Sequence, residues 1–269
     1  MTYYAFLSTL LLTLSGCIQK APLKLPQNSQ QHIVYTQDFN ILTLHKNKDQ
    51  TAKQTDTLRI YLEGDGRAWR NRYSPSTNPT PTQSVIVDMF SMDTSDYKAY
   101  IARPCQFTPS DKCHKTYWTG ARYSEEIIKS LDTAVDQIKQ KMDAKSIQLI
   151  GHSGGGTVAL LLAARRDDIT SIITLAGNLN HADFTTTHKL TPMKASLNPA
   201  NHIKQTKHIP QIHFAGGQDN VIPPALVKNY TQQANNSCVN METLPQVSHH
   251  EGWLQHTTYI LNKKPSCKK

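Results

Sequence analysis

The chain has 269 residues, 38% of them hydrophobic, and a formal net charge of +9. This length suits one large domain with a substantial core and is short for two. The basic residues are scattered, without the concentrated stripe and interleaved aromatic residues of nucleic-acid-binding proteins, so we expect no nucleic-acid partner. Solvated surface, or attraction to an anionic membrane, accounts for the charge.

The first sixteen residues, MTYYAFLSTLLLTLSG, are uncharged and mostly apolar. They are too short to span a bilayer comfortably and suit an export signal. Residues 14–17, LSGC, resemble the lipobox of bacterial lipoproteins. That resemblance implies a signal peptide at 1–16 and acylation of Cys17. The alternative is an ordinary secretory signal in which Cys17 has no role.

The residue after Cys17 is Ile18, whereas an aspartate there commonly retains lipoproteins on the inner membrane. We therefore expect a lipid anchor in the outer membrane, with the protein facing the periplasm. Residues 17–31 are polar and contain prolines, which predicts a tether between membrane and domain. Residues 32–269 are expected to form a single domain, and the protein to be a monomer.

Strand-like and helix-like segments alternate after the tether. The expected strands are 57–66, which ends in a glycine loop, 98–106, 146–151, 169–177, 209–217 and 238–245. The expected helices are 124–142, with Ser124 as cap, the apolar run after Ser153, 223–235 and 253–264. Mostly apolar strands separated by helices predict an α/β fold, in which helices cover both faces of a mostly parallel sheet.

Two segments interrupt this alternation, Tyr73 to Gln83 and Asn178 to His208. Both are polar, and both are expected at the edge where the parallel strands end. Long loops inside a compact domain tend to be functional. We expect them to form walls of a site or a small lid over it.

Four cysteines remain after Cys17, an even number for a chain expected to fold in an oxidising compartment. Three pairings are possible. Cys105 and Cys113 bracket one short loop, and Cys238 and Cys267 flank the C-terminal segment. Local pairing within these two regions is therefore the prediction. Neither C-x-x-C nor H-E-x-x-H spacing occurs, so we expect no metal site.

The sequence GHSGGG places Ser153 between an apolar strand and an apolar helix. A G-x-S-x-G turn joins the two so sharply that larger residues at Gly151, Gly154 and Gly155 would clash. Such a turn holds the serine on a strained backbone with its hydroxyl pointing out of the sheet. This arrangement favours a nucleophile over a glycine-rich packing turn.

The order serine, acid, histidine along the chain resembles that of the α/β-hydrolase superfamily, over roughly residues 35–264. The segment FAGGQDNVIPP is similar to the loop of that family that supplies the acid, which assigns this role to Asp219. The alternative is an aspartate that only shapes a turn. No cofactor is expected for this chemistry.

Two adjacent histidines, His249 and His250, follow the last expected strand, where the family has its general base. Chain order alone does not separate them. Trp253 stands four residues after His249, and the family's base precedes a tryptophan by the same spacing at the head of the last helix. This resemblance favours His249, with His250 as the alternative. His152 is expected to point away from the nucleophile.

The resemblance also implies an oxyanion hole. One donor is the backbone N–H of Gly154, and the second is the N–H of Asp65 or, as an alternative, Gly66. Glu63 and Asp65 replace the neutral residues found in many esterases. A simple oxyanion hole then requires the two carboxylates to point away and pair with Arg67 or Arg122.

The segments YLEGDGRAW, ARPCQF, YWTGARYSEE, LAGNLN and ASLNP resemble a group of small α/β-hydrolase lipoproteins of Gram-negative bacteria. The resemblance implies a serine hydrolase that acts on a small ester or thioester substrate through an acyl-enzyme on Ser153. A non-catalytic envelope binding protein with the same fold and a serine peptidase are the alternatives.

Overall fold

The computed structural model describes residues 23–46 and 56–268, which form a central eight-stranded sheet in the order β1-β2-β6-β3-β7-β8-β9-β10. The strands are β1 (Gln30–Tyr35), β2 (Asn40–His45), β3 (Thr57–Leu62), β6 (Lys98–Ile101), β7 (Ser146–His152), β8 (Ile169–Leu175), β9 (Gln211–Gly216) and β10 (Val239–Leu244). All pairs from β6 to β10 are parallel, and β1 and β2 are antiparallel at one edge. The predicted mostly parallel sheet is confirmed.

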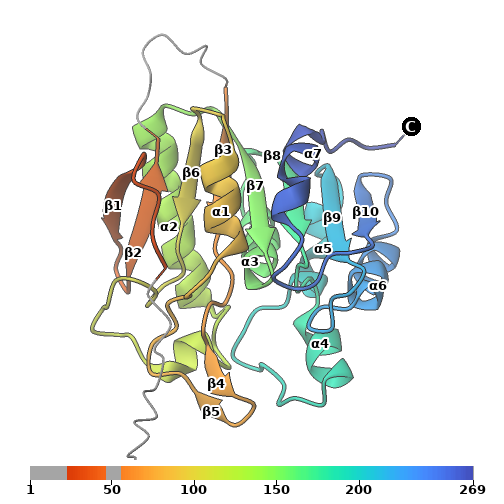
Figure 1. The fold of residues 1–269 in the computed structure, drawn as a ribbon, viewed down its shortest axis with the longest axis horizontal. Coiled ribbons are helices and arrows are strands. Elements are labelled where there is room, and N and C mark those ends of the chain that lie inside the picture. The colour runs from red at the N-terminus through yellow and green to blue at the C-terminus, as the bar shows by residue number, and fades with distance from the viewer. Residues whose placement is uncertain (1–22, 47–55, 269) are drawn as a thin grey trace, which may run out of the picture.

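Helices cover both faces of the sheet. They are α1 (Val85–Met92), α2 (Glu125–Met142), α3 (Gly154–Ala163), α4 (His181–Thr187), α5 (Ile203–Thr206), α6 (Pro224–Ala234) and α7 (Thr257–Asn262). Figure 1 shows α1 and α7 in front of the sheet and α2 and α3 behind it. Every residue of α3 is buried, because this helix packs on β7 and β8 and is flanked by α2 and α5. The expected α/β fold with helices on both faces is confirmed.

The elements that lie where none was predicted include β1, β2 and α1. β1 and β2 form an antiparallel hairpin, and β1 begins at Gln30, so the end of the expected tether belongs to this strand. α1 contributes five buried residues to the core. Its N-cap, Ser84, accepts a hydrogen bond from the N–H of Val87, an ordinary helix start signal. The last helix is shorter than expected, because a 3₁₀ turn (Leu254–His256) precedes α7.

The two long segments also contain regular structure. The first begins within a small hairpin in which β4 (Trp69–Asn71), just before the segment, pairs with β5 (Ser74–Pro75) inside it. The second contains α4, a 3₁₀ turn (Pro199–His202) and α5. Both the hairpin and α4 lie at the bottom of Figure 1, beyond the carboxyl ends of the parallel strands. The prediction about where these segments emerge is therefore confirmed.

The structure contains the two locally paired disulfides, Cys105–Cys113 and Cys238–Cys267. The second holds the C-terminal tail beside the start of β10. There the N–H of Lys268 donates to the carbonyl of Ser237 over 2.9 Å. Cys17 and the expected signal peptide lie outside the described residues. Within the described part of the chain, no helix combines the length and the apolar character needed to cross a membrane.

Candidate active site

Ser153 occupies a sharp turn between β7 and α3. Its backbone has φ 54° and ψ −118°, a conformation that few non-glycine residues adopt. A Cβ atom on Gly151 would lie 2.3 Å from the carbonyl group of Gly155, and one on Gly155 would lie 2.2 Å from the carbonyl oxygen of Leu62. Only glycine fits at these positions, because backbone atoms fill the space.

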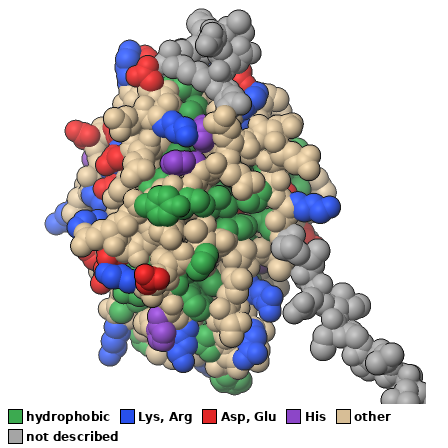
Figure 2. All heavy atoms as spheres, turned by 90° about the vertical axis from the view of Figure 1, so that its left-hand side faces the viewer, with side chains coloured by type: hydrophobic (Ala, Val, Ile, Leu, Met, Phe, Trp, Pro, Cys, Tyr) green, Lys and Arg blue, Asp and Glu red, His purple; other side chains and the backbone are tan. Residues whose placement is uncertain are grey.

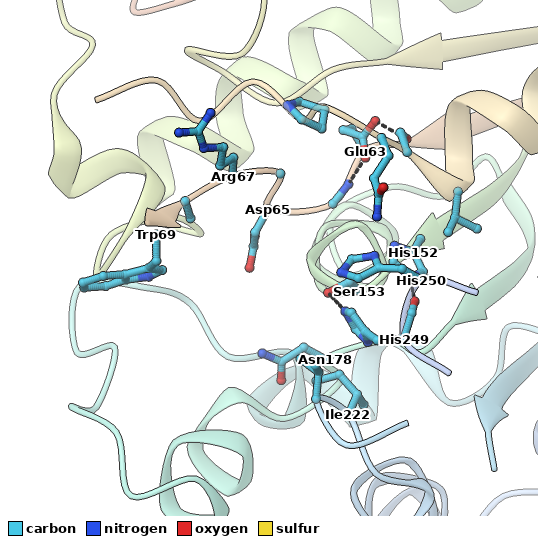
Figure 3. Close-up of a pocket in the computed structure, with 18 of the residues that line it drawn as sticks. Glu63, Asp65, Arg67, Trp69, His152, Ser153, Asn178, Ile222, His249 and His250 are labelled. Atoms are coloured by element: carbon cyan, nitrogen blue, oxygen red, sulfur yellow. Dashed lines mark hydrogen bonds between the residues drawn. The ribbon is translucent and has the colours of Figure 1, made fainter. Parts of the chain in front are cut away.

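Ser153, His249 and Asp219 form a hydrogen-bonded series, of which Figure 3 shows Ser153 and His249. The Ser153 hydroxyl lies 3.1 Å from Nε2 of His249, and Nδ1 of His249 lies 2.8 Å from Oδ2 of Asp219. The carboxylate accepts a hydrogen bond from Nδ1–H, which leaves Nε2 as the acceptor for the serine hydroxyl. The structure therefore brings together the three residues predicted from chain order.

Asp219 is fixed by the loop that follows β9. Its second oxygen, Oδ1, accepts hydrogen bonds from the N–H groups of Val221 and Ile222, at 2.7 and 2.8 Å. The side chain is fully buried. A carboxylate held by two backbone donors has one oxygen free to orient the histidine.

His250 makes no hydrogen bond to Ser153 or Asp219, both of which are described. Its ring packs edge-on against His249, with ring centroids 4.7 Å apart. Burial and then the neighbouring His249 lower the pKa of His250. Of the adjacent pair, His249 is therefore the residue whose geometry suits a general base.

His152 lies beneath His249, a relation that the sequence did not indicate. Its Nε2 is 2.8 Å from the backbone carbonyl oxygen of His249, and Nε1 of Trp253 donates to the same oxygen at 3.1 Å. Burial, followed by the charge of His249, holds the pKa of His152 well below its usual value. A neutral His152 with its proton on Nε2 fixes the backbone of His249.

The loop after β3 packs against the nucleophile turn. A Cβ on Gly64 would lie 3.1 Å from the carbonyl oxygen of His152, so the loop approaches the turn closely. Glu63 is buried, and it accepts hydrogen bonds from Gly64 N–H, the Ser84 hydroxyl and the Tyr100 hydroxyl at 2.8, 2.6 and 2.9 Å. Burial raises the pKa of Glu63, although these hydrogen bonds oppose the shift.

Asp65 is held by cations and a phenol. Its carboxylate bonds to Arg122 at 2.7 Å, to Arg103 at 3.1 Å and to the Tyr123 hydroxyl at 2.9 Å. Burial alone would raise the pKa of Asp65, but Arg122 and Arg103 bring it below its ordinary value. The expected pairing with Arg122 is present, whereas Glu63 bonds to neutral donors and not to Arg67.

The N–H groups of Gly154 and Asp65 lie on the two segments that meet at the nucleophile. Gly154 is the first residue of α3, where backbone N–H groups have no acceptor within the helix. A Cβ on Gly154 would lie 2.2 Å from Oδ1 of Asp65, which shows how closely the two segments approach. Gly66, the alternative donor, has φ 60° and turns the chain toward Pro79.

A cavity of about 560 Å³ opens beside Ser153. Both long segments contribute to its walls, the first with Pro81 to Gln83 and the second with Asn178 and Phe184. Trp69 lies at the far end of the cavity from the histidines (Figure 3). Trp69 is the last residue of the segment YLEGDGRAW, which carried part of the family resemblance, but no role was predicted for Trp69 itself.

His152, His249 and His250 are close enough together, among the described residues, to be considered as metal ligands, with nitrogen atoms within 4.8 Å of one another. Both nitrogens of His249 already bond to Asp219 and Ser153. A metal ion on this cluster would have to displace one of these bonds. With their present hydrogen bonds, His249 contacts Ser153 and Asp219, and His152 holds the backbone of His249.

Solved structures show the same fold. An esterase from Pyrococcus furiosus is 14% identical with a TM-score of 0.60, covering 91% of this chain and 97% of its own. An α/β serine hydrolase homologue from Coxiella burnetii is 14% identical with a TM-score of 0.59, covering 88% and 98%. A lidless α/β serine hydrolase from Xanthomonas campestris is 13% identical with a TM-score of 0.56, covering 91% and 100%.

Comparison with curated protein sequences gives no significant match. The model of one family, described as the PGAP1-like alpha/beta domain, matches residues 115–252, just over half of the chain. This stretch runs from the segment before α2 to the turn after His249 and includes all three residues of the hydrogen-bonded series. The chain therefore belongs to the PGAP1-like α/β domain family, within the α/β-hydrolase superfamily.

Proposed function

We propose that the protein is a serine hydrolase that cleaves a carboxylic ester or thioester through an acyl-enzyme on Ser153. The observation that carries this proposal is the series Asp219–His249–Ser153, with distances of 2.8 and 3.1 Å, on the strained turn before α3. A serine on this backbone, next to an oriented histidine, has the geometry of an activated nucleophile.

Ser153, His249 and Asp219 have different roles in the reaction. Nε2 of His249 accepts the hydroxyl proton as Ser153 Oγ bonds to the acyl carbonyl carbon. The same nitrogen then returns the proton to the leaving alkoxide or thiolate as its bond to that carbon breaks. Nε2 of His249 next takes a proton from water as the water oxygen bonds to the acyl carbon. It returns this proton to Ser153 Oγ as the bond between Oγ and that carbon breaks, which releases the acid and the free serine. Asp219 keeps the ring in the required tautomer and stabilises the imidazolium.

The negative charge of the tetrahedral intermediate forms on the side of Asp65 and Gly154, whose N–H groups we assign as donors. One such donor contributes about 3 to 4 kcal/mol in other hydrolases. Arg103 and Arg122 face the single carboxylate of Asp65, which leaves one excess positive charge near the oxyanion. The carboxylate is therefore compensated and does not repel the intermediate.

Two alternatives share this fold. A non-catalytic binding protein would not need the complete series of hydrogen bonds from Asp219 to Ser153. A serine peptidase would use the same series with a pocket for a peptide. The described cavity ends at an exposed aromatic residue, Trp69, and contains no feature that favours a peptide. We therefore place the peptidase second.

A fluorophosphonate probe tests the proposal, because it forms a covalent bond only with an activated serine. We expect the full chain to be labelled and the Ser153→Ala variant to remain unlabelled. Hydrolysis of a p-nitrophenyl ester, compared with that of a p-nitroanilide, then separates esterase from peptidase. A folded protein that neither reacts with the probe nor hydrolyses either compound is a binding protein.

The proposal includes the location. We infer that Cys17 is acylated and anchors the domain in the outer membrane, facing the periplasm, on the support of residues 14–17 and Ile18. The two disulfides fit an oxidising compartment. At this location, the proposed reaction would use water together with the side chains and backbone groups of the site.

A further inference from the structure

Arg67, Trp69 and Val221 line the cavity beside Ser153. The surface formed by residues 67–73, residues 188–194 and Val221 is called the basic rim. Hydrogen bonds connect them. The guanidinium group of Arg72 donates to the carbonyls of His188 and Lys189, at 3.5 and 3.3 Å. Nε2 of His188 lies 2.9 Å from the carbonyl oxygen of Val221. The rim is therefore one continuous surface.

The basic rim exposes large hydrophobic side chains. Tyr73 is 85% exposed and Trp69 is 41% exposed, and Leu190 and Val221 are exposed as well. These four make up half of the eight large hydrophobic side chains exposed among the described residues. Trp69 and Val221 also line the cavity, so the apolar surface leads directly into the proposed site.

The charge of the basic rim has one sign. Arg67, Arg70, Arg72 and Lys189 are exposed, and no ion pair among the described residues involves them. The sequence contains no Asp or Glu in 66–87 or in 184–218. Figure 2 shows acidic and basic side chains intermixed on the upper part of one face, and Lys, Arg and His at its lower end.

We propose that the basic rim docks on an anionic phospholipid bilayer. Tryptophan and tyrosine are enriched at membrane–water interfaces because their rings are apolar with one polar group. Each basic residue near an anionic surface contributes about 1 kcal/mol. A soluble protein partner would require acidic residues facing four unpaired cations, and a bilayer supplies such charges without a defined shape.

Docking brings the cavity mouth to the lipid headgroups. If the proposed hydrolase function holds, the ester that reaches Ser153 then belongs to a lipid of that bilayer. This step rests on the proposed function, whereas the docking itself does not. The proposal thus assigns a substrate class, a membrane lipid ester, to the site.

Quenching of tryptophan fluorescence by brominated phospholipid tests the docking. The full chain is mixed with brominated vesicles of phosphatidylcholine alone or with phosphatidylglycerol added. We expect quenching only with phosphatidylglycerol and its loss in high salt. Trp69→Phe should remove most of it, because Trp253 is buried and Trp118 is only partly exposed. Equal quenching on both kinds of vesicle, or none, would overturn the proposal.

The variant Arg70→Glu/Tyr73→Ser alters the basic rim without touching a residue that lines the cavity. We expect the docked fraction to fall about tenfold or more, since the charge reversal removes one attraction and adds one repulsion. The matched control, Lys141→Glu/Lys264→Glu, changes two exposed lysines at the ends of α2 and α7, away from the rim. It should dock as the unmodified protein does.

Fluorophosphonate labelling separates the two proposals. The rim variant should be labelled at Ser153 at the unmodified rate, because its site is intact. If the unmodified protein docks on the vesicles but is not labelled by the probe, the hydrolase proposal fails and the docking proposal is supported. If the unmodified protein is labelled but the rim variant docks as well as the control variant does, the rim proposal fails. Hydrolysis of a soluble ester with no activity on vesicle lipids contradicts the substrate class alone.

Discussion

Among the described residues, four others contact His249 through hydrogen bonds. Asp219 orients its ring, Ser153 uses its second nitrogen, and His152 and Trp253 hold its backbone carbonyl. His250 has none of these partners, although it is adjacent in the chain. The difference between the two positions lies entirely in which side of the loop each side chain faces.

Alanine at His249 should therefore abolish turnover, while alanine at His250 should not. We expect His249→Ala to lower kcat for a p-nitrophenyl ester by about 10⁴-fold or more, the size of loss seen when a member of a catalytic triad is removed. His250→Ala should stay within about tenfold of the unmodified enzyme, because it removes only ring packing. If His250→Ala lowered kcat more than His249→Ala did, His250 would be the general base.

His213 makes folding stability depend on pH. Burial lowers its pKa to about 3, while the unfolded chain has the ordinary value of 6.5. Its ring bonds to Thr174 and Gln211 at 2.8 and 3.0 Å. Below pH 6.5 the unfolded chain binds a proton that the folded chain does not, so stability falls as the pH falls toward 3.

The expected loss from His213 is about 1.4 kcal/mol per pH unit below pH 6.5, or about 2 kcal/mol between pH 7.5 and pH 5. Urea unfolding at the two pH values measures it. His213→Asn should lower the stability at pH 7.5 but show a smaller decrease on acidification. If both proteins lose the same free energy, His213 does not titrate as its burial implies.

Chain order and strand ends predict Ser153, Asp219 and the pair His249 and His250, because a parallel sheet brings the carboxyl ends of its strands to one edge. Only the family's spacing to Trp253 favoured His249 within the pair. The partners of Asp65 follow no such rule. Arg103 and Tyr123 come from loops whose course depends on tertiary packing, so the sequence indicated Arg122 and missed the other two. His152 was expected to point away from Ser153, and its bond to the His249 backbone depends on a loop 97 residues distant.

At the scale of elements, the disulfide loop between Cys105 and Cys113 supports the proposed oxyanion loop. Arg103, just before the first cysteine, bonds to Asp65, and Nε2 of Gln106 donates to the carbonyl of Gly64 at 3.1 Å. The disulfide Cys238–Cys267 lies at the other end of the chain, without such a contact among the described residues. The first disulfide therefore supports the proposed oxyanion loop, whereas the second holds the C-terminal tail.

Removal of Cys238–Cys267 should cost more stability, whereas removal of Cys105–Cys113 should cost more activity. Chain entropy predicts a loss of about 2.5 kcal/mol for the separation of 8 residues and about 3.6 kcal/mol for that of 29. We expect Cys105→Ser/Cys113→Ser to lower kcat more than Cys238→Ser/Cys267→Ser, although it destabilises less. Urea unfolding and ester hydrolysis measure the two quantities. Equal kcat values for both double variants would contradict the supporting role.

The alternating core of the fold was predictable because its strands and long helices have clear apolar periods. α2 has buried residues at Ile127, Ile128, Leu131 and Ile138, the helical spacing visible in the sequence. β1 was not predicted, because this edge strand is mostly exposed and has a weak apolar pattern. β2 is almost completely buried, but its apolar residues are interrupted by the buried polar residues Thr43 and His45. α1 is a short β-branched run, VIV, whose own preference is for a strand.

At the scale of the whole molecule, attachment to the membrane depends on residues before the described domain. We predict that globomycin, which blocks lipoprotein signal cleavage, causes the uncleaved precursor to accumulate in expressing cells. The Cys17→Ser variant should give the same precursor without the inhibitor. Immunoblotting of the precursor and mature forms measures this. Normal processing in the presence of globomycin would mean that the chain carries an ordinary signal.

The C-terminal tail lies beside the start of β10, at one edge of the sheet. β10 is the last strand of the sheet, and an unpaired edge strand can form hydrogen bonds with a strand of another molecule. The tail lies beside the start of this strand, where Asn240 bonds to the carbonyl of Ser266 and Cys267 is bonded to Cys238. Because the disulfide keeps the tail in place, reduction of that bond would leave this edge open to pairing between molecules, and solubility would then depend on the redox state.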